Sequence, residues 1–98
     1  MKFANKVKQI VQNIPRGRVS TYKLVAKKAG NSKASRAVGL ILNRAHKKGE
    51  GLPCFRVVKS DGSTGGYALG SLVKKSKLLK EGIKIKNNKI VDFQKILI

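Results

Sequence analysis

Apolar residues near the N-terminus recur at the spacing of an amphipathic helix, with Lys, Gln and Asn between them. The series predicts a helix over residues 3–14, which Pro15 terminates. A second helix is expected after Ser20 or Thr21, because either hydroxyl can cap a helix N-terminus. The apolar positions of the two helices are Phe3, Val7, Ile10, Val11, Ile14, Leu24, Val25 and Ala26.

A third helix is predicted over residues 33–45, after a break at 29–32 that contains Gly30. This third helix combines small residues with arginine. Two short helices that are joined by a tight, glycine-containing turn are typical of a helix-turn-helix. The apolar positions of the third helix are Ala34, Ala37, Val38, Ile41 and Leu42.

The second half of the chain mixes strand and helix signals. Residues 55–58 form a short apolar run, and residues 60–66 have the composition of a turn. Helical spacing resumes at 72–79, and residues 83–91 alternate apolar and polar around an Asn-Asn pair, which predicts a hairpin or wing. We therefore expect a mainly α fold, a winged helix-turn-helix DNA-binding domain with a small β element.

The charge of the chain is extreme, with 23 Lys and Arg against 4 Asp and Glu and a net charge of +19. Its length predicts a single domain over residues 1–98. Basic residues lie along the whole chain, so they predict a folded surface for an anionic partner, DNA or RNA. Apolar runs fall far short of the roughly 20 residues of a membrane span. We expect no membrane contact, and a monomer in the cytoplasm, associated with the nucleoid.

The single cysteine, Cys54, is the candidate for chemistry. One cysteine can form neither an internal disulfide nor a Cys-rich zinc site, and no metal is expected. Nearby positive charge favours a thiolate over a thiol, so a lone cysteine in a cationic chain is a candidate nucleophile.

Five short blocks of the chain follow one another in the order of one protein family. The blocks are 14–22 (IPRGRVSTY), 34–39 (ASRAVG), 53–58 (PCFRVV), 65–67 (GGY) and 78–82 (LLKEG). In these blocks the chain resembles the C-terminal DNA-binding and active-site domain of the O6-alkylguanine-DNA alkyltransferases. The similarity covers about residues 3–85, without the N-terminal domain common in the family; Met1 and the family-like start are those expected of a whole short protein.

This resemblance implies a catalytic set. Members of the family flip an alkylated guanine out of the duplex and transfer the alkyl group irreversibly to a cysteine, without a cofactor. Cys54 aligns with the alkyl acceptor, and a soft thiolate suits attack on the carbon of an alkyl–oxygen bond. Glu81 aligns with the buried glutamate that orients a histidine, and Tyr22 with the tyrosine that meets the displaced nucleotide. The implied base pocket comprises Pro53, Phe55, Val57, Gly65, Gly66 and Tyr67.

The resemblance also narrows the expected partner to double-stranded DNA and implies how the DNA is held. Arg36 aligns with the arginine that enters the base stack, where a long, flat cation can fill the hole left by the flipped base. The residues around Arg36 are small, which would let the helix fit the narrow minor groove that the family binds. The implied DNA-binding residues are Thr21, Tyr22, Ser35, Arg36, Ala37 and Gly39.

Phe55 departs from the family, which has a histidine beside the cysteine to accept the thiol proton. A general base is typically worth ~10²–10⁴-fold in rate. The net positive charge, or a helix N-terminus near Cys54, would lower the pKa of the thiol and recover part of the loss; Glu81 could also reach the thiol through water. His46, the only histidine, is interpreted as a residue of the surface loop at 46–51.

Two other functions stay open at this point. The family includes alkyltransferase-like proteins, which bind alkylated guanine without transferring it and usually replace the cysteine while they keep the histidine. This chain does the reverse, which favours transfer. The third alternative is a plain winged-helix DNA-binding protein in which Cys54 is only part of the core.

Overall fold

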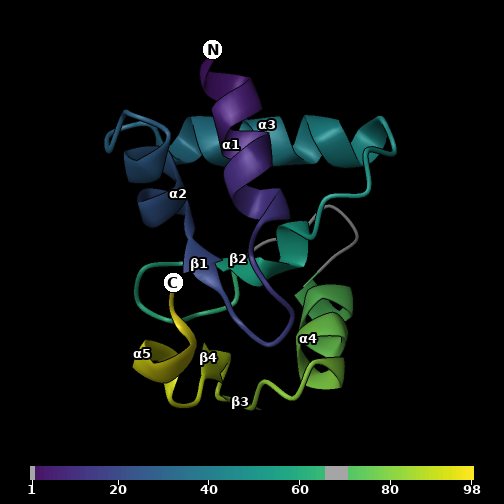
Figure 1. Cartoon of the computed structure of the whole chain (residues 1–98). Helices are drawn as coiled ribbons and strands as arrows, with labels where there is room; N and C mark the ends of the chain where they lie inside the picture. Colours follow the sequence, from purple (N-terminus) through teal and green to yellow (C-terminus); the bar gives the residue numbers. More distant parts are fainter. Residues whose placement is uncertain (1, 66–70) are drawn as a thin grey trace.

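The computed structural model describes residues 2–65 and 71–98. Figure 1 shows three helices of the N-terminal half at one end of the molecule and the C-terminal half at the other. The helices are α1 (Phe3–Gln12), α2 (Tyr22–Lys28) and α3 (Ser35–Lys47), and they pack against one another. The predicted mainly helical, helix-turn-helix architecture is confirmed.

Helix boundaries follow local capping chemistry. Helix α1 stops at Gln12, two residues short of the prediction, and Ile14 lies beyond it but stays buried. Helix α2 is capped by Thr21, whose Oγ1 accepts a hydrogen bond from the Leu24 backbone N–H at 3.0 Å. Helix α3 extends past the predicted end, so His46 lies in its last turn and not in a loop.

Two short strands join the halves of the chain. Strand β1 (Ser20–Thr21) pairs in parallel with β2 (Val57–Val58), and Ser20 lies opposite Val57. A single turn of 3-10 helix, η1 (Cys54–Arg56), leads directly into β2. Because α2 begins directly after β1, this pairing brings its first residue, Tyr22, to the segment that carries Cys54.

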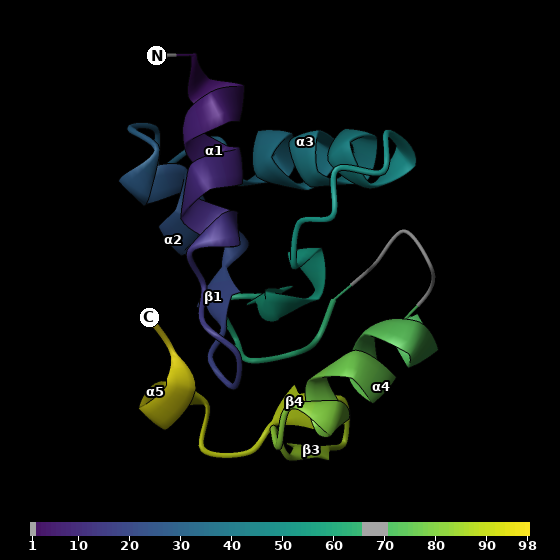
Figure 2. The same cartoon turned by 45° about the vertical axis from the view of Figure 1, so that its right-hand side comes forward.

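Beyond β2 the chain forms the helix and hairpin that the sequence predicts. Helix α4 (Ser71–Lys80) precedes the antiparallel pair β3 (Ile85–Lys86) and β4 (Lys89–Ile90). The turn residues Asn87 and Asn88 have φ values of 52° and 63°, the left-handed backbone that a tight two-residue hairpin requires. The wing is thus present, and Figure 2 shows it beside the end of α4.

The C-terminal segment was not predicted from the sequence. Helix α5 (Phe93–Ile96) leads into a tail that pairs with the residue before β1. The Val19 N–H donates to the Ile96 carbonyl at 3.0 Å, and the Ile98 N–H donates to the Val19 carbonyl at 2.9 Å. The C-terminal tail therefore forms backbone hydrogen bonds with Val19, directly before β1.

Buried apolar residues form two clusters, one at each end of the molecule. The first unites the three N-terminal helices and includes Cys54, and the second lies under α4 and the wing. Their buried members are Val7, Val11, Ile14, Val25, Ala26, Ala29, Val38, Leu42, Cys54 and Val57 in the first, and Val19, Val58, Leu78, Ile83 and Ile90 in the second. No helix within residues 2–65 and 71–98 is long and apolar enough to cross a bilayer.

Candidate active site

Cys54 opens η1 at the edge of the first core cluster. Its side chain is 7% exposed, and its thiol donates to the Leu42 carbonyl oxygen of α3 at an Sγ–O distance of 3.9 Å. A hydrogen bond from S–H to a carbonyl stabilises the protonated form. The free protein therefore holds Cys54 as a neutral thiol that is close to the surface but not open to it.

The surroundings of Cys54 raise the pKa of its thiol. Burial is the main cause, and the charge of Glu50 adds to it, while a backbone hydrogen bond, Lys74 and Lys77 act in the opposite direction. The neighbouring lysines lower the pKa of the thiol, which is the expected direction, but they do not set the net shift, which is upward in the free protein. Desolvation disfavours the thiolate by more than the neighbouring lysines favour it.

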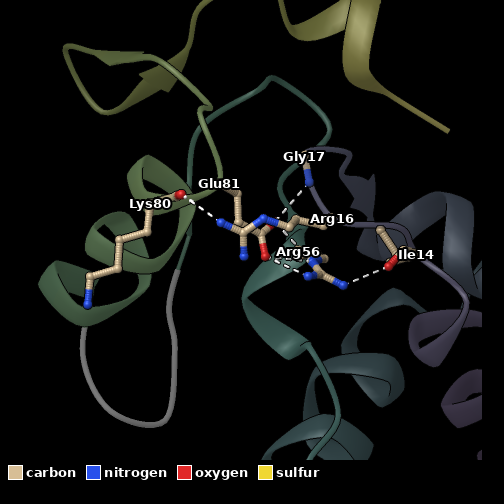
Figure 3. A network of polar contacts seen from close by, with 6 residues as sticks. All are labelled: Ile14, Arg16, Gly17, Arg56, Lys80 and Glu81. Atoms are coloured by element: carbon tan, nitrogen blue, oxygen red, sulfur yellow. Dashed lines mark hydrogen bonds and ion pairs between the residues drawn. The ribbon is translucent and has the colours of Figure 1, made fainter.

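Glu81, the predicted partner of the missing histidine, forms an ion pair with Arg56 (Figure 3). Arg56 Nε lies 3.0 Å and 3.1 Å from the two carboxylate oxygens, and Arg56 Nη2 lies 2.5 Å from Oε2. Glu81 also accepts the Gly17 backbone N–H at 3.0 Å, and Arg56 Nη1 donates to the Ile14 carbonyl at 2.8 Å. The pair thus connects the segment after α1, the end of α4 and η1.

The protonation state of Glu81 follows from these contacts. Burial alone would raise the pKa of its carboxyl group, but the hydrogen bonds from Arg56 and Gly17 outweigh burial and hold the pKa below its usual range. Arg16 supports the same corner by donating to the Lys80 carbonyl at 3.0 Å (Figure 3). In the free protein Glu81 is an ionised anchor for Arg56.

Phe55 takes the place of the family's histidine and faces two cations. The Arg56 guanidinium lies 5.2 Å from the centre of the Phe55 ring, and Lys77 Nζ lies 5.5 Å from it. Such distances fit cation–π contacts. The ring lines a surface hollow together with Pro53, Lys77 and His46. His46 thus lies nearer to the site than a residue of a remote loop would.

Four of the predicted DNA-binding residues come together on one face. Tyr22, Ser35, Arg36 and Gly39 line a shallow depression, here called the Tyr22 hollow. A Cβ atom on Gly39 would lie 4.0 Å from Tyr22 Cε1, so the Tyr22 ring lies against α3 at this position. The Arg36 side chain is exposed and Ala37, beside it, is partly buried.

A neighbouring hollow shares Tyr22 and Ser35 and is basic. Its other lining residues are lysines and hydroxyl-bearing residues, the side chains that commonly contact nucleic-acid phosphates. They are Lys23, Ser32, Lys33, Lys59 and Ser60. Individual surface lysines gave no signal in a sequence so rich in them, and only the fold shows that these five residues surround one hollow.

The remaining predicted residues divide between the interior and the loop after β2. Thr21 is only 3% exposed and its hydroxyl caps α2, so its position does not support the predicted DNA contact of its side chain. Val57 is fully buried. Gly65 lies beside Tyr22, since a Cβ there would be 3.8 Å from Tyr22 Cε2. Gly66 and Tyr67 lie outside the described residues.

Lys74 was missed by sequence reasoning. Its side chain is fully buried, and its Nζ donates to the Val57 carbonyl at 2.6 Å and to the Tyr22 hydroxyl at 3.4 Å. Burial lowers the pKa of Lys74 to about 8, although attraction to Cys54 opposes the shift. A signal existed in the sequence, because Lys74 precedes the core residue Leu78 by one helical turn and so occupies an inward position.

Within the described part of the chain, no group of three His, Cys, Asp or Glu residues could hold a metal ion. Around the Cys54 thiol the fold brings together Tyr22, Lys74 and Phe55.

Comparison with known proteins shows which protein family this chain resembles. Residues 2–83 match the family described as 6-O-methylguanine DNA methyltransferase, DNA binding domain. A bifunctional methyltransferase/endonuclease of Thermoplasma volcanium is 42% identical over 89 residues, which are 89% of this chain and 27% of the relative. The DNA base-flipping protein of Escherichia coli K12 is 38% identical over 93 residues, 95% of this chain and 71% of that protein.

The solved structure of a related protein has the same fold as this chain. Schizosaccharomyces pombe Atl1, in complex with damaged DNA that contains O6-carboxymethylguanine, matches with a TM-score of 0.86 and 27% identity, over 100% of this chain and 98% of that chain. The agreement extends over the wing and the C-terminal tail, which the family match at 2–83 does not include. The chain belongs to the family of 6-O-methylguanine DNA methyltransferase DNA-binding domains.

Proposed function

We propose that this chain repairs O6-alkylguanine in double-stranded DNA by irreversible transfer of the alkyl group to Cys54. The observation that carries the proposal is the position of Tyr22. Its ring lines the Tyr22 hollow with Arg36, and its pKa is raised first by burial and then by the charge of Cys54. One side chain therefore connects the DNA-facing surface to the nucleophile.

The path of the reaction follows from this arrangement. Arg36, exposed at the start of α3, enters the stack from the minor groove and replaces the flipped guanine. The base passes Tyr22 toward Cys54. A bond forms between Sγ and the alkyl carbon while the carbon–O6 bond breaks. Guanine leaves with the electron pair and takes up one proton, in exchange for the proton lost by the thiol. The transfer needs no cofactor. Each protein molecule repairs one lesion, and it acts as a monomer close to the nucleoid.

Recognition of the lesion without transfer is the second candidate. Two observations favour it, the raised pKa of the Cys54 thiol and the replacement of the family's histidine by Phe55. The Atl1 match over the whole chain, in a complex with damaged DNA, is consistent with the same function. Transfer ranks first because the acceptor thiol itself is present at the matching position.

Intact mass measurement separates the candidates. The protein is incubated with a duplex that contains one O6-methylguanine, and with the same duplex containing guanine as control. Transfer predicts a mass gain of one CH₂ group that is absent in Cys54→Ser. No gain, with tighter binding to the damaged duplex, supports lesion recognition. Equal binding to both duplexes without a mass gain leaves a general DNA-binding protein and overturns the proposal.

A further inference from the structure

Lys74 is an unusual residue for the interior. Among the described residues it is the one charged side chain that is fully buried; the other buried polar residues are Ser20, Thr21 and Thr64. Burying an ammonium group is costly unless it is hydrogen-bonded or paired. The sequence offers many exposed positions for lysine on α4, so an inward lysine there suggests that the charge itself has a use.

Lys74 contacts two residues from the segments around Cys54. Its Nζ donates to the carbonyl of Val57, three residues after Cys54, and to the hydroxyl of Tyr22, the residue that lines the DNA-facing hollow. Its charge also acts directly on Cys54, since the two groups shift each other's ionisation. Hydrogen bonds therefore fix the Lys74 amine between Val57 and Tyr22, and from this position its charge acts on the thiol.

We propose that Lys74 replaces the family's histidine as the proton acceptor for Cys54, an inference that rests on the proposed transfer function. The neutral amine takes the proton of the Cys54 thiol, which leaves a thiolate and an ammonium group side by side. The thiolate attacks the alkyl carbon and the carbon–O6 bond breaks. The guanine that leaves takes the proton from the ammonium group, so Lys74 returns to its neutral form. The proton lost by the thiol is thus the one that guanine gains.

The protonation behaviour of Lys74 fits this role. A pKa of about 8 leaves a useful fraction of the amine neutral near neutral pH, which an ordinary surface lysine does not have. The other charged groups that act on the thiol are Lys77 and Glu50, and Cys54 in turn raises the pKa of Tyr22. Lys77 lies over the Phe55 ring, and Glu50 opposes ionisation of the thiol. Lys74 is the group among these that combines burial, fixed hydrogen bonds and a lowered pKa.

Two substitutions separate the charge of Lys74 from its basicity. Lys74→Gln keeps a hydrogen-bond donor for Val57 but removes charge and base, and Lys74→Arg keeps the charge but cannot accept a proton. Lys75→Gln is the matched control, because Lys75 is the next residue of α4 and donates to Asn88 of the wing. Urea unfolding of each variant establishes that it is folded. If Lys74→Gln does not fold, Lys74→Met, whose side chain fills similar space, takes its place in the comparison.

The first readout is independent of DNA. Cys54 is alkylated by iodoacetamide across a pH series, and the midpoint of its reactivity is compared among variants. We expect Lys74→Gln to move the midpoint to higher pH, and Lys74→Arg and Lys75→Gln to leave it close to the wild type. A profile for Lys74→Gln that superimposes on the wild type overturns the inference, whether or not the protein acts on DNA.

The second readout is the single-turnover rate of methyl transfer from an O6-methylguanine duplex. We expect a loss of ~10²–10⁴-fold in both Lys74 variants, as for removal of a general base, and no change in Lys75→Gln. Wild-type transfer with an unchanged rate in Lys74→Arg overturns the proton-acceptor role. A wild type that transfers nothing refutes the proposed function instead, while the iodoacetamide series still decides whether Lys74 controls the thiol.

Discussion

Removing the carboxylate of Glu81 should destabilise the fold far more than removing an exposed charge. The Glu81 side chain is 4% exposed and that of Arg56 is 16% exposed. In Glu81→Ala the Arg56 guanidinium keeps the Ile14 carbonyl as its recorded hydrogen-bond partner, and Gly17 loses its acceptor. Breaking a buried pair from one side costs ~3–5 kcal/mol. The lower value is appropriate here because Arg56 is partly exposed.

A loss of ~3 kcal/mol is large against a typical domain stability of ~5–15 kcal/mol. At ~4–8 °C per kcal/mol for a domain of this size, Tm should fall by roughly 12–24 °C. Urea unfolding followed by circular dichroism measures the free energy directly. The matched control is Glu50→Ala, which removes the Lys8–Glu50 pair, whose side chains are both 30% exposed, and should cost at most ~1 kcal/mol.

Equal losses in Glu81→Ala and Glu50→Ala would refute this account of the Arg56–Glu81 pair. The pH dependence of the stability that Glu81 contributes provides a second check. Because the folded pKa of Glu81 is depressed, its contribution to stability is present above the pKa of an unfolded glutamate, about 4.3, and is lost as pH falls through the folded value. The stability gap between wild type and Glu81→Ala should therefore narrow in acid. Loss of transfer in Glu81→Gln at unchanged stability would instead assign Glu81 to the chemistry.

Three further predictions concern DNA and the thiol. Phe55→His should increase the single-turnover transfer rate by less than the ~10²–10⁴-fold worth of a missing general base, because Lys74 already accepts the thiol proton; a gain of that full size would contradict the role proposed for Lys74. Arg36→Ala should weaken binding to a damaged duplex more than the wing substitution Lys84→Ala, measured by fluorescence anisotropy, and equal effects would refute the insertion of Arg36. Affinity for undamaged duplex should fall linearly on a log–log plot against salt, with a slope of about −0.9 per phosphate contacted; a flat plot would contradict binding through the basic surface.

Periodic apolar positions predicted the helices of the N-terminal half because each helix buries one face, and the Asn87–Asn88 pair predicted the hairpin. The β1–β2 pair has no such signal, since a strand of two residues contains no complete period. Helix α5 has only four residues, about one helical turn, and its position depends on backbone pairing with Val19. Pairing between distant segments depends on partners that a local pattern does not specify.

The site shows the same division. The family blocks named Cys54 and the residues of the Tyr22 hollow, and the fold brings Tyr22, Ser35, Arg36 and Gly39 together, while their roles toward DNA stay predictions. The blocks did not predict the ionisation of the thiol, since a count of charges contains no information about burial. Lys74 was overlooked for a related reason. In a chain with 23 basic residues, one more lysine on a helix looks like part of a solvated face until the fold shows it inside.

The parallel pairing of β1 with β2 has a consequence for how the protein folds. Each N-terminal helix forms through backbone hydrogen bonds between residues that are near in sequence, whereas Ser20 must find Val57 across the whole of α2 and α3. Closing such a loop costs chain entropy before any contact compensates for it. The helices can therefore form early, but Tyr22 and Cys54 meet only when this high-contact-order pair closes. Hydrogen exchange at the Val58 amide would report the assembly of the site without any DNA present; the Val57 amide would not, because its N–H donates to the Cys54 carbonyl within η1.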